Sequence, residues 1–245
     1  MRHPKDREDF SRFVVHLTRD FDGADPLENL VAILRFRRIE ARSAHCLFSY
    51  KIAGIGFSSV LKKKFNTVCL TEVPLNQLRY IVGAYPGRRI ELAPYGLVFL
   101  KSNLLEKGAN PVIYVNSQET GLRNFLLNQF KDHFGSRKTY RSLRKSYGDH
   151  ADAIIRYYSL VNLLSPRVDF SWEREWRHQG HLKFEYREIV AIVVPDPERF
   201  SANLRRYFGR ALAKEIDMIA VVSPHWSYEQ LLEATSICVR NAKSK

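Results

Sequence analysis

The sequence predicts an α+β fold, and three observations support that prediction. Short apolar runs of strand-like composition are spread along the chain, and they alternate with stretches whose apolar residues recur at helical spacing. Clusters of Gly, Pro, Asp and Asn separate these runs and are typical of turns. The sequence contains no repeat, low-complexity tract or clear linker. We therefore expect one mixed domain that spans residues 1–245.

The elements are expected in the following order. Pro26 stands in the favoured first-turn position, so it opens a helix whose apolar residues Leu27, Leu30, Val31, Ile33 and Leu34 have helical spacing. The irregular segment 43–66 is expected to be a loop region with at most one short helix. The strands are expected at 13–18, 67–71, 97–100, 112–115, 182–184, 189–194 and 218–222. Further helices are expected at 74–81, 201–214 and 227–239.

Residues 118–165 are predicted to be a helical insertion that carries the densest basic stretch. Its cations are Lys131, Arg137, Lys138, Arg141, Arg144 and Lys145, interleaved with Phe134, Tyr140 and Tyr147. Lys and Arg bind phosphates while aromatic rings stack on unpaired bases, so the pattern indicates a nucleic-acid contact. The alternative is an ordinary solvated helix face.

Composition indicates a basic protein with enough apolar residues for a core. The 245 residues are 45% hydrophobic, and 39 Lys and Arg against 26 Asp and Glu give a net charge of +13. Such an excess favours polyanionic partners, with nucleic acid first and an acidic protein as the alternative.

Several classes of protein are disfavoured by the sequence. The apolar runs are too short to cross a bilayer, and the first residues lack the apolar core of a signal peptide. The three cysteines form no CxxC pair, which points to a reducing cytoplasm. His178 and His181 have no third ligand at suitable spacing, so no metal site is expected. No Gly-rich phosphate loop or dinucleotide fingerprint is present.

Residues 170–178 are the most informative segment, and we expect them to form one extended strand. Side chains of a strand alternate between its faces, so Ser171, Glu173, Glu175 and Arg177 would share one face. Two carboxylates and a guanidinium are costly to bury together unless they are used, so this face is a candidate active site. The alternative is an edge strand whose charges form surface ion pairs.

His16 and Thr18 form a second candidate site. They are two residues apart on the first expected strand, so both project from one face and can present a ring nitrogen and a hydroxyl to a polar ligand. The alternative for His16 is a histidine satisfied within the core.

The order of several short motifs resembles two families. Residues 13–18, 27–34 and 39–41 resemble the opening of the DarT-type ADP-ribosyltransferases. Residues 67–75, 95–99, 108–115 and 173–177 resemble the AbiGi family of abortive-infection proteins, and that likeness covers most of 13–195.

The resemblance implies an ADP-ribosyltransferase-like fold, with a mixed or antiparallel split β-sheet core, flanking helices and the basic helical insertion. It also implies NAD as substrate. His16, with Leu17 and Thr18 beside it, and Asn29 would hold NAD, and Tyr95 would stack on nicotinamide. Glu175 would be the catalytic carboxylate, with Glu173 acting on the acceptor as a general base. Arg177 would either orient the glutamates or bind a phosphate. A further cation is implied after the first helix, for which Arg42, Lys51 and 62–64 are candidates.

The resemblance further implies a toxin of a bacterial anti-phage system that transfers ADP-ribose to RNA or single-stranded DNA in the cytoplasm. Such an activity would harm its own cell, so a neutralising antitoxin protein is expected as a partner. Two alternatives remain open: a non-catalytic antitoxin or nucleic-acid-binding regulator, and an ADP-ribosyltransferase that acts on protein.

Overall fold

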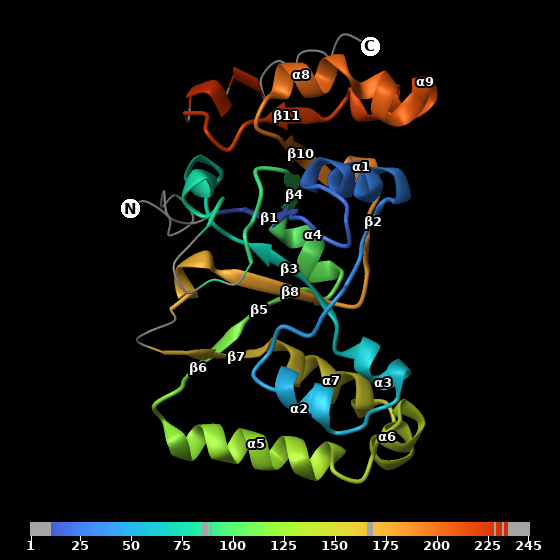
Figure 1. Cartoon of the computed structure of the whole chain (residues 1–245), viewed down its shortest axis with the longest axis vertical. Helices are drawn as coiled ribbons and strands as arrows, with labels where there is room; N and C mark the ends of the chain where they lie inside the picture. Colours follow the sequence, from blue (N-terminus) through green and yellow to red (C-terminus); the bar gives the residue numbers. More distant parts are fainter. Residues whose placement is uncertain are drawn as a thin grey trace. The chain divides into compact units, whose positions relative to one another are not determined.

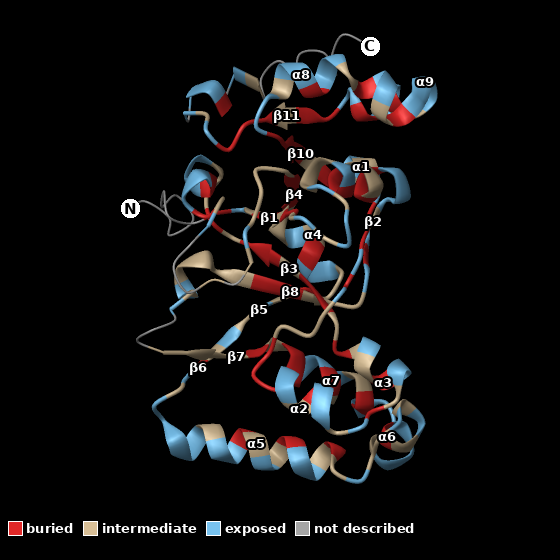
Figure 2. Ribbon diagram, in the orientation of Figure 1, coloured by how far each residue is buried: buried red, intermediate tan, exposed pale blue. Residues whose placement is uncertain are grey.

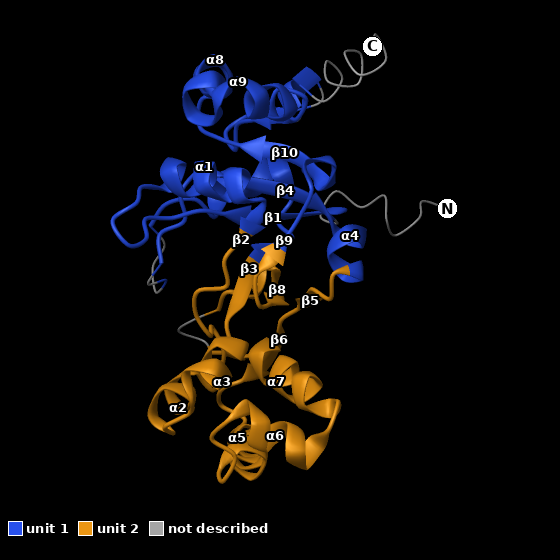
Figure 3. Cartoon of the chain, turned by 90° about the vertical axis from the view of Figure 1, so that its right-hand side faces the viewer, with its two compact units in different colours: residues 1–38, 70–106, 183–245 blue, residues 39–69, 107–182 orange. Residues whose placement is uncertain are grey.

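A computed structural model describes residues 11–84, 88, 90–165, 169–227, 229–231, 233 and 234 of the chain. The chain divides into two compact units, and each is built from separate stretches of sequence (Figure 3). The first unit contains residues 1–38, 70–106 and 183–245, and the second contains 39–69 and 107–182. The second unit therefore includes more of the chain than the helical insertion expected at 118–165.

The first unit is a mostly antiparallel sheet with flanking helices (Figure 1). Its strand order is β11-β10-β4-β1-β3, in which the β10–β11 pair is parallel and the other pairs of neighbouring strands are antiparallel within the described residues. The strands are β1 (Phe13–Leu17), β4 (Gly96–Leu100), β10 (Ile189–Val193), β11 (Ala220–Val222) and the last two residues of β3 (Thr67–Thr71). The helices are α1 (Pro26–Phe36), α4 (Lys101–Glu106), α8 (Pro197–Ala202), α9 (Leu204–Ile216) and the 3₁₀ turns η2 (Leu75–Tyr80) and η4 (Tyr186–Glu188). The predicted α+β class is confirmed.

The pairing of β1 with β4 depends on a glycine. Leu17 lies opposite Gly96, and a Cβ atom added to Gly96 would lie 2.1 Å from the carbonyl oxygen of His16. A glycine inside a strand often marks such a close backbone approach. Gly96 therefore allows β4 to lie against the strand that carries His16.

Helix α1 begins where the sequence predicts. Asp25 Oδ1 accepts a hydrogen bond from the backbone N–H of Glu28 at 2.8 Å, and Glu28 Oε2 accepts one from the backbone N–H of Asp25 at 2.9 Å. This reciprocal capping box satisfies two N–H groups that a helix start leaves unpaired, and Pro26 follows at the first helical position.

The second unit combines helices with short strands. Its strand order is β3-β8-β5, with a separate parallel pair of β6 and β7. The strands are β5 (Asn110–Pro111), β6 (Ile113–Asn116), β7 (Val161–Leu164), β8 (Glu175–Gln179) and the first three residues of β3. The helices are α2 (Ser49–Gly54), α3 (Ser59–Lys64), α5 (Thr120–Phe134), α6 (Tyr140–Tyr147), α7 (His150–Leu160) and the 3₁₀ turn η3 (Ser171–Glu173). A short pair, β2 (Arg38–Ile39) with β9 (Leu182–Lys183), completes the strands.

Aromatic rings form the centre of the second unit. Phe130 of α5 stacks on Phe48 with ring centroids 4.7 Å apart, and it meets the edge of Tyr158 of α7 at 5.0 Å. Phe134 and Phe65 contact the same cluster. Figure 2 shows the buried face of α5 turned inward and its other face exposed. This core includes residues from both stretches of the unit, so it holds 39–69 and 107–182 together.

Some elements differ from the prediction. The segment 43–66 contains two short helices, α2 and α3, instead of one at most, because its apolar side chains pack into the aromatic core. The helix expected at 201–214 is two helices, and Gly209 breaks the second with φ of 73°. Helix α4 was not predicted. Most of the helix expected at 227–239 lies outside the described residues.

Within the described ranges, none of the helices has both the length and the apolar composition that crossing a bilayer requires.

Replacing Phe130 by alanine is expected to destabilise the protein by about 3–5 kcal/mol, because a fully buried ring leaves a cavity. Urea unfolding measures the loss. Phe125→Ala on the same helix is the control, because Phe125 is 58% exposed, and we expect its effect to stay within about 0.5 kcal/mol. Equal effects of the two variants would contradict the assigned core.

Asp152 links three helices of the second unit. Its carboxylate accepts hydrogen bonds from Lys64 Nζ at 2.9 Å and from the Tyr140 hydroxyl at 2.6 Å, and Lys64 Nζ lies 3.9 Å from the centroid of the Tyr140 ring. Burial alone would raise the pKa of Asp152, but the hydrogen bonds from Tyr140 and Lys64 outweigh burial and lower it. The ionised form is therefore favoured by folding.

The Asp152→Asn variant should lose stability that depends on pH. A carboxylate whose folded pKa is lowered stabilises the fold above its unfolded pKa of about 4, and this contribution is lost as the pH falls through the folded value. We expect the native protein to melt above the variant at pH 6 and the gap to close below about pH 4. Asp149→Asn is the control, because Asp149 is 97% exposed. A gap that is constant with pH would contradict the assignment.

Candidate functional site

The segment predicted as one strand at 170–178 is a turn followed by a strand. Residues Ser171–Glu173 form a 3₁₀ turn, and Arg174 takes a left-handed conformation with φ of 44°. Strand β8 begins only at Glu175. The carboxylate of Asp169 accepts hydrogen bonds from the backbone N–H and the hydroxyl of Ser171, which favours the turn over an extended chain. The expected strand is therefore wrong in its first half.

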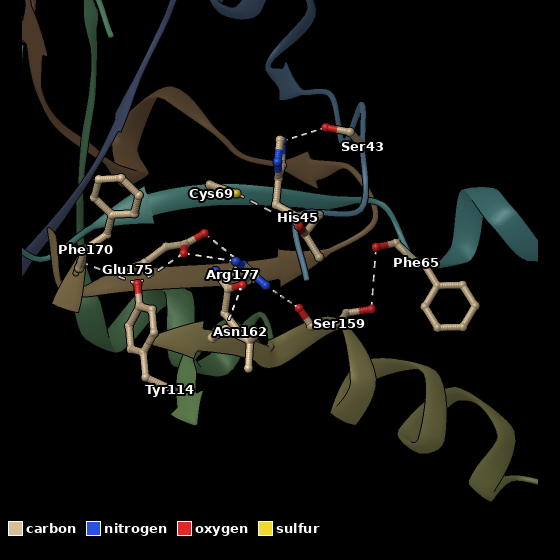
Figure 4. A network of polar contacts seen from close by, with 12 residues as sticks. Ser43, His45, Phe65, Cys69, Tyr114, Ser159, Asn162, Phe170, Glu175 and Arg177 are labelled. Carbon is tan, nitrogen blue, oxygen red and sulfur yellow. Dashed lines mark hydrogen bonds and ion pairs between the residues drawn. The ribbon is translucent and has the colours of Figure 1, made fainter. Parts of the chain in front are cut away.

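Glu175 and Arg177 form a buried, two-pronged ion pair in the second unit (Figure 4). Arg177 Nε donates to Glu175 Oε1 at 2.8 Å, and Arg177 Nη2 donates to Glu175 Oε2 at 3.0 Å. The side chain of Arg177 is 1% exposed and that of Glu175 is 14% exposed. Both residues lie on β8 two positions apart, so they share one face as predicted. The fork of donors fixes the orientation of the carboxylate.

The same guanidinium group also binds the end of helix α7. Arg177 Nη1 donates to the carbonyl oxygen of Ser159 at 2.7 Å. The last carbonyl groups of a helix lack partners within it, and the helix passes directly into the extended Val161. A cation at this position satisfies an unpaired acceptor and suits the negative end of the helix dipole.

The environment of Arg177 favours its charged form. Burial alone would lower the pKa of Arg177, but the negative charge of Glu175 outweighs burial and raises the pKa. Arg177 is therefore a permanent cation beneath the carboxylate of Glu175.

A tyrosine lies on the other side of this carboxylate. The hydroxyl of Tyr114, on β6, is 3.5 Å from Glu175 Oε2 and 3.4 Å from the carbonyl oxygen of Phe170. Burial, and next the charge of Glu175, raise the pKa of Tyr114. The phenol therefore stays protonated at neutral pH and can donate a hydrogen bond.

Two cysteines of this unit are unsuited to nucleophilic chemistry. Burial, followed by the charge of Glu175, raises the pKa of Cys69 to about 12, and burial also raises the pKa of Cys46. Thiolates are the reactive form, so both side chains are inert thiols at neutral pH. The polar chemistry available beside β8 is therefore that of a carboxylate.

Glu173 is not part of the Glu175–Arg177 pair. The 3₁₀ turn and the left-handed Arg174 remove Glu173 from the strand, so the expected shared face of the two glutamates is wrong. The charge of Glu173 nevertheless contributes to raising the pKa of Tyr114. Its proposed action on an acceptor stays a prediction.

The residues predicted to hold NAD lie in the first unit, whereas Glu175 lies in the second. Two of them are engaged by the backbone. The Thr18 hydroxyl donates to the carbonyl oxygens of Pro26 and Tyr95 at 2.9 and 3.2 Å. The side-chain amide of Asn29 donates to the carbonyl oxygens of Arg19, Ala24 and Asp25. Both side chains therefore hold the segment between β1 and α1 in place, and their role in binding NAD stays a prediction.

The other three predicted NAD residues differ in exposure. Leu17 is buried in the core of the first unit, and His16 lies half-buried on β1 opposite Leu97 of β4. Tyr95 is partly buried, and burial is the main cause of its raised pKa.

The cations predicted to contact nucleic acid lie in the second unit, at the end of α5, in α6 and between them. Lys131, Arg141, Arg144 and Lys145 are exposed, and Arg137 and Lys138 are half-buried. Arg137 donates to the carbonyl oxygens of Asp132 and His133 and to the hydroxyl of Ser146, so it joins α5 to α6.

Among the residues that the structure describes, no group of three or more His, Cys, Asp and Glu side chains could hold a metal ion. His178 Nδ1 is 3.2 Å from the carbonyl oxygen of Gly180, and His181 Nδ1 accepts from the backbone N–H of Ala41.

Sequence reasoning did not identify three groups around the Glu175–Arg177 pair: the Tyr114 hydroxyl, the Cys69 thiol and the Ser159 carbonyl oxygen. Tyr114 and Cys69 lie within predicted strands, but no local pattern relates either strand to β8.

Comparison with known proteins adds no relative: no family model, no curated protein and no solved structure matches this chain.

Arg177→Met is expected to destabilise the protein by about 3–5 kcal/mol, because it leaves Glu175 buried without its cation. The double variant Glu175→Gln/Arg177→Met should recover part of that loss, because no charge then remains buried. Urea unfolding followed by tryptophan fluorescence measures both. Arg156→Met, at an exposed position on α7, serves as the control. A single-variant loss no larger than that of Arg156→Met would show that the pair is not structural.

Proposed function

We propose that this protein transfers ADP-ribose from NAD to nucleic acid, with Glu175 as the catalytic carboxylate. The observation that supports this most directly is the orientation of the carboxylate of Glu175, whose side chain is 14% exposed and is fixed by a bidentate interaction with the buried Arg177. Cleavage of NAD at the nicotinamide ribose builds positive charge on the sugar. A preorganised carboxylate stabilises such charge as it develops, without reorganising at the moment of reaction.

The transfer requires only NAD and the acceptor as reactants. The bond between nicotinamide and C1′ of the ribose breaks, and the bonding electrons leave with nicotinamide. The nucleophilic atom of the acceptor forms a bond to C1′ and releases a proton. Glu175 stabilises the cationic sugar, Arg177 positions Glu175, and Tyr114 can donate a hydrogen bond at the same carboxylate.

The resemblance to DarT-type and AbiGi proteins supports the same reaction and a role in bacterial anti-phage defence. On that basis, His16, Thr18, Asn29 and Tyr95 contribute to binding NAD, and a neutralising protein partner accompanies the enzyme. An ADP-ribosyltransferase-like fold and a cytoplasmic location belong to the same proposal.

A second function is a nucleic-acid-binding protein without catalytic activity. The observation that favours it is the engagement of Thr18 and Asn29 with backbone carbonyl groups, which gives both side chains a structural role. NAD distinguishes the two proposals. An enzyme that binds NAD is stabilised by it through mass action, whereas a pure nucleic-acid binder is not.

Glu175→Gln is expected to lower ADP-ribose transfer by about 10²–10³-fold, because it removes the charge that faces the cationic sugar while keeping an oxygen toward Arg177. The assay incubates the protein with NAD labelled in the ADP-ribose part, and with RNA, single-stranded DNA or cell protein in separate reactions.

Two controls accompany this assay. The melting temperature of Glu175→Gln shows whether the variant is folded, and Tyr114→Phe removes a hydroxyl at the same carboxylate without changing a charge. A folded Glu175→Gln protein that labels its acceptor at the native rate would exclude Glu175 as the catalytic residue. Label on protein alone would exclude nucleic acid as the acceptor.

A further inference from the structure

The positive charge of this protein is concentrated in the second unit. That unit has 17 Lys and Arg against 8 Asp and Glu, a net charge of +9. The larger first unit has 22 against 18, a net charge of +4. The second unit therefore carries most of the +13 of the chain.

Most acidic residues of the second unit form ion pairs or hydrogen bonds within that unit. Four of them form ion pairs with cations: Glu40 with Arg42, Asp149 with Arg144, Asp152 with Lys64 and Glu175 with Arg177. Two others cap local backbone: Glu119 accepts from Gly121, and Asp169 accepts from Ser171. These six carboxylates already have partners, so they do not neutralise the remaining cations of the unit.

The cations of α3, α5, α6 and the turn between α5 and α6 include two distinct groups. Lys64, Arg137 and Arg144 bind carboxylate, carbonyl or hydroxyl oxygens of their own unit. By contrast, four exposed side chains have no ion pair or side-chain hydrogen bond within the described part of the chain. These four are Lys63, Lys131, Arg141 and Lys145, and we refer to them as the basic surface.

Contacts between the helices bring together the segments that carry the basic surface. Arg137 joins the end of α5, which carries Lys131, to Ser146 of α6. Lys64 of α3 lies over the ring of Tyr140, the first residue of α6. Lys63 and Arg141 are the direct neighbours of Lys64 and Tyr140 in the sequence. Figure 1 shows α3 and α6 side by side.

Helix stability does not account for the charges of α6. Arg141 and Lys145 are four residues apart, and a like-charged pair at this spacing destabilises a helix by about 0.2–0.5 kcal/mol. Arg141 also lies in the first turn, where the helix dipole disfavours a cation. Both costs are relieved when an anion binds here.

We propose that the basic surface binds the phosphodiester backbone of nucleic acid. Three of its four side chains are lysines. Lysine is depleted in protein–protein interfaces, whereas its ammonium group commonly binds phosphate as a point charge. RNA and single-stranded DNA share this backbone chemistry. That the basic surface docks the acceptor of ADP-ribose rests on the proposed function. That it binds nucleic acid does not, because this binding is measured without NAD.

The test measures binding of labelled RNA and single-stranded DNA oligonucleotides to the full-length protein over a range of salt concentrations. Each phosphate contact with a single strand contributes about 0.7 to the slope of log affinity against log salt. We expect Arg141→Gln/Lys145→Gln to lower that slope by about 1.4 and to weaken binding. The control is Arg205→Gln/Arg206→Gln, which removes the same charge from exposed positions of α9 in the first unit and should leave the slope unchanged.

The proposal is overturned if the native protein binds neither oligonucleotide at low salt, or if the two double variants behave alike. Equally tight binding of polyglutamate would also overturn it, because any acidic polymer would then suffice. Oligonucleotide binding by Glu175→Gln separates the two proposals. If Glu175→Gln and the native protein both bind and neither transfers label, the enzyme proposal fails and the basic surface stands.

Discussion

The buried guanidinium group of Arg177 is the interaction on which the second unit depends. A charge inside a protein is tolerated only when its donors are satisfied, and Arg177 satisfies three of them on Glu175 and on the carbonyl oxygen of Ser159. One side chain thus joins strand β8 to the end of helix α7. It also gives the Glu175 carboxylate a single orientation, so packing and the chemistry of the candidate site have the same physical origin.

The environment of the pair determines which chemistry is available. Burial, and next the charge of Glu175, raise the pKa of both Cys69 and Tyr114, so each keeps its proton at neutral pH. The site therefore presents the carboxylate of Glu175, paired with the Arg177 cation, together with two groups that stay neutral. Such an arrangement suits the stabilisation of a positive charge, and it does not suit attack by a thiolate.

Thr18 and Asn29 of the first unit have a structural role that their contacts with the backbone define. The resemblance implies that both side chains hold NAD, and in the structure both donate to backbone carbonyl groups of the segments around β1 and α1. Such bonds fix the shape of a loop, and a fixed loop is also what a ligand requires of its binding site. The contacts explain why the side chains are polar and buried.

The sequence by itself determined the features that depend on neighbours along the chain. It predicted most strands, the start of α1 at Pro26, and the shared face of Glu175 and Arg177, because capping and strand alternation are local properties. Only the tertiary structure decided that Arg174 turns before β8, that Tyr114 and Ser159 meet the pair, and which cations are already paired. Those outcomes depend on contacts between residues far apart in sequence, which no local pattern specifies.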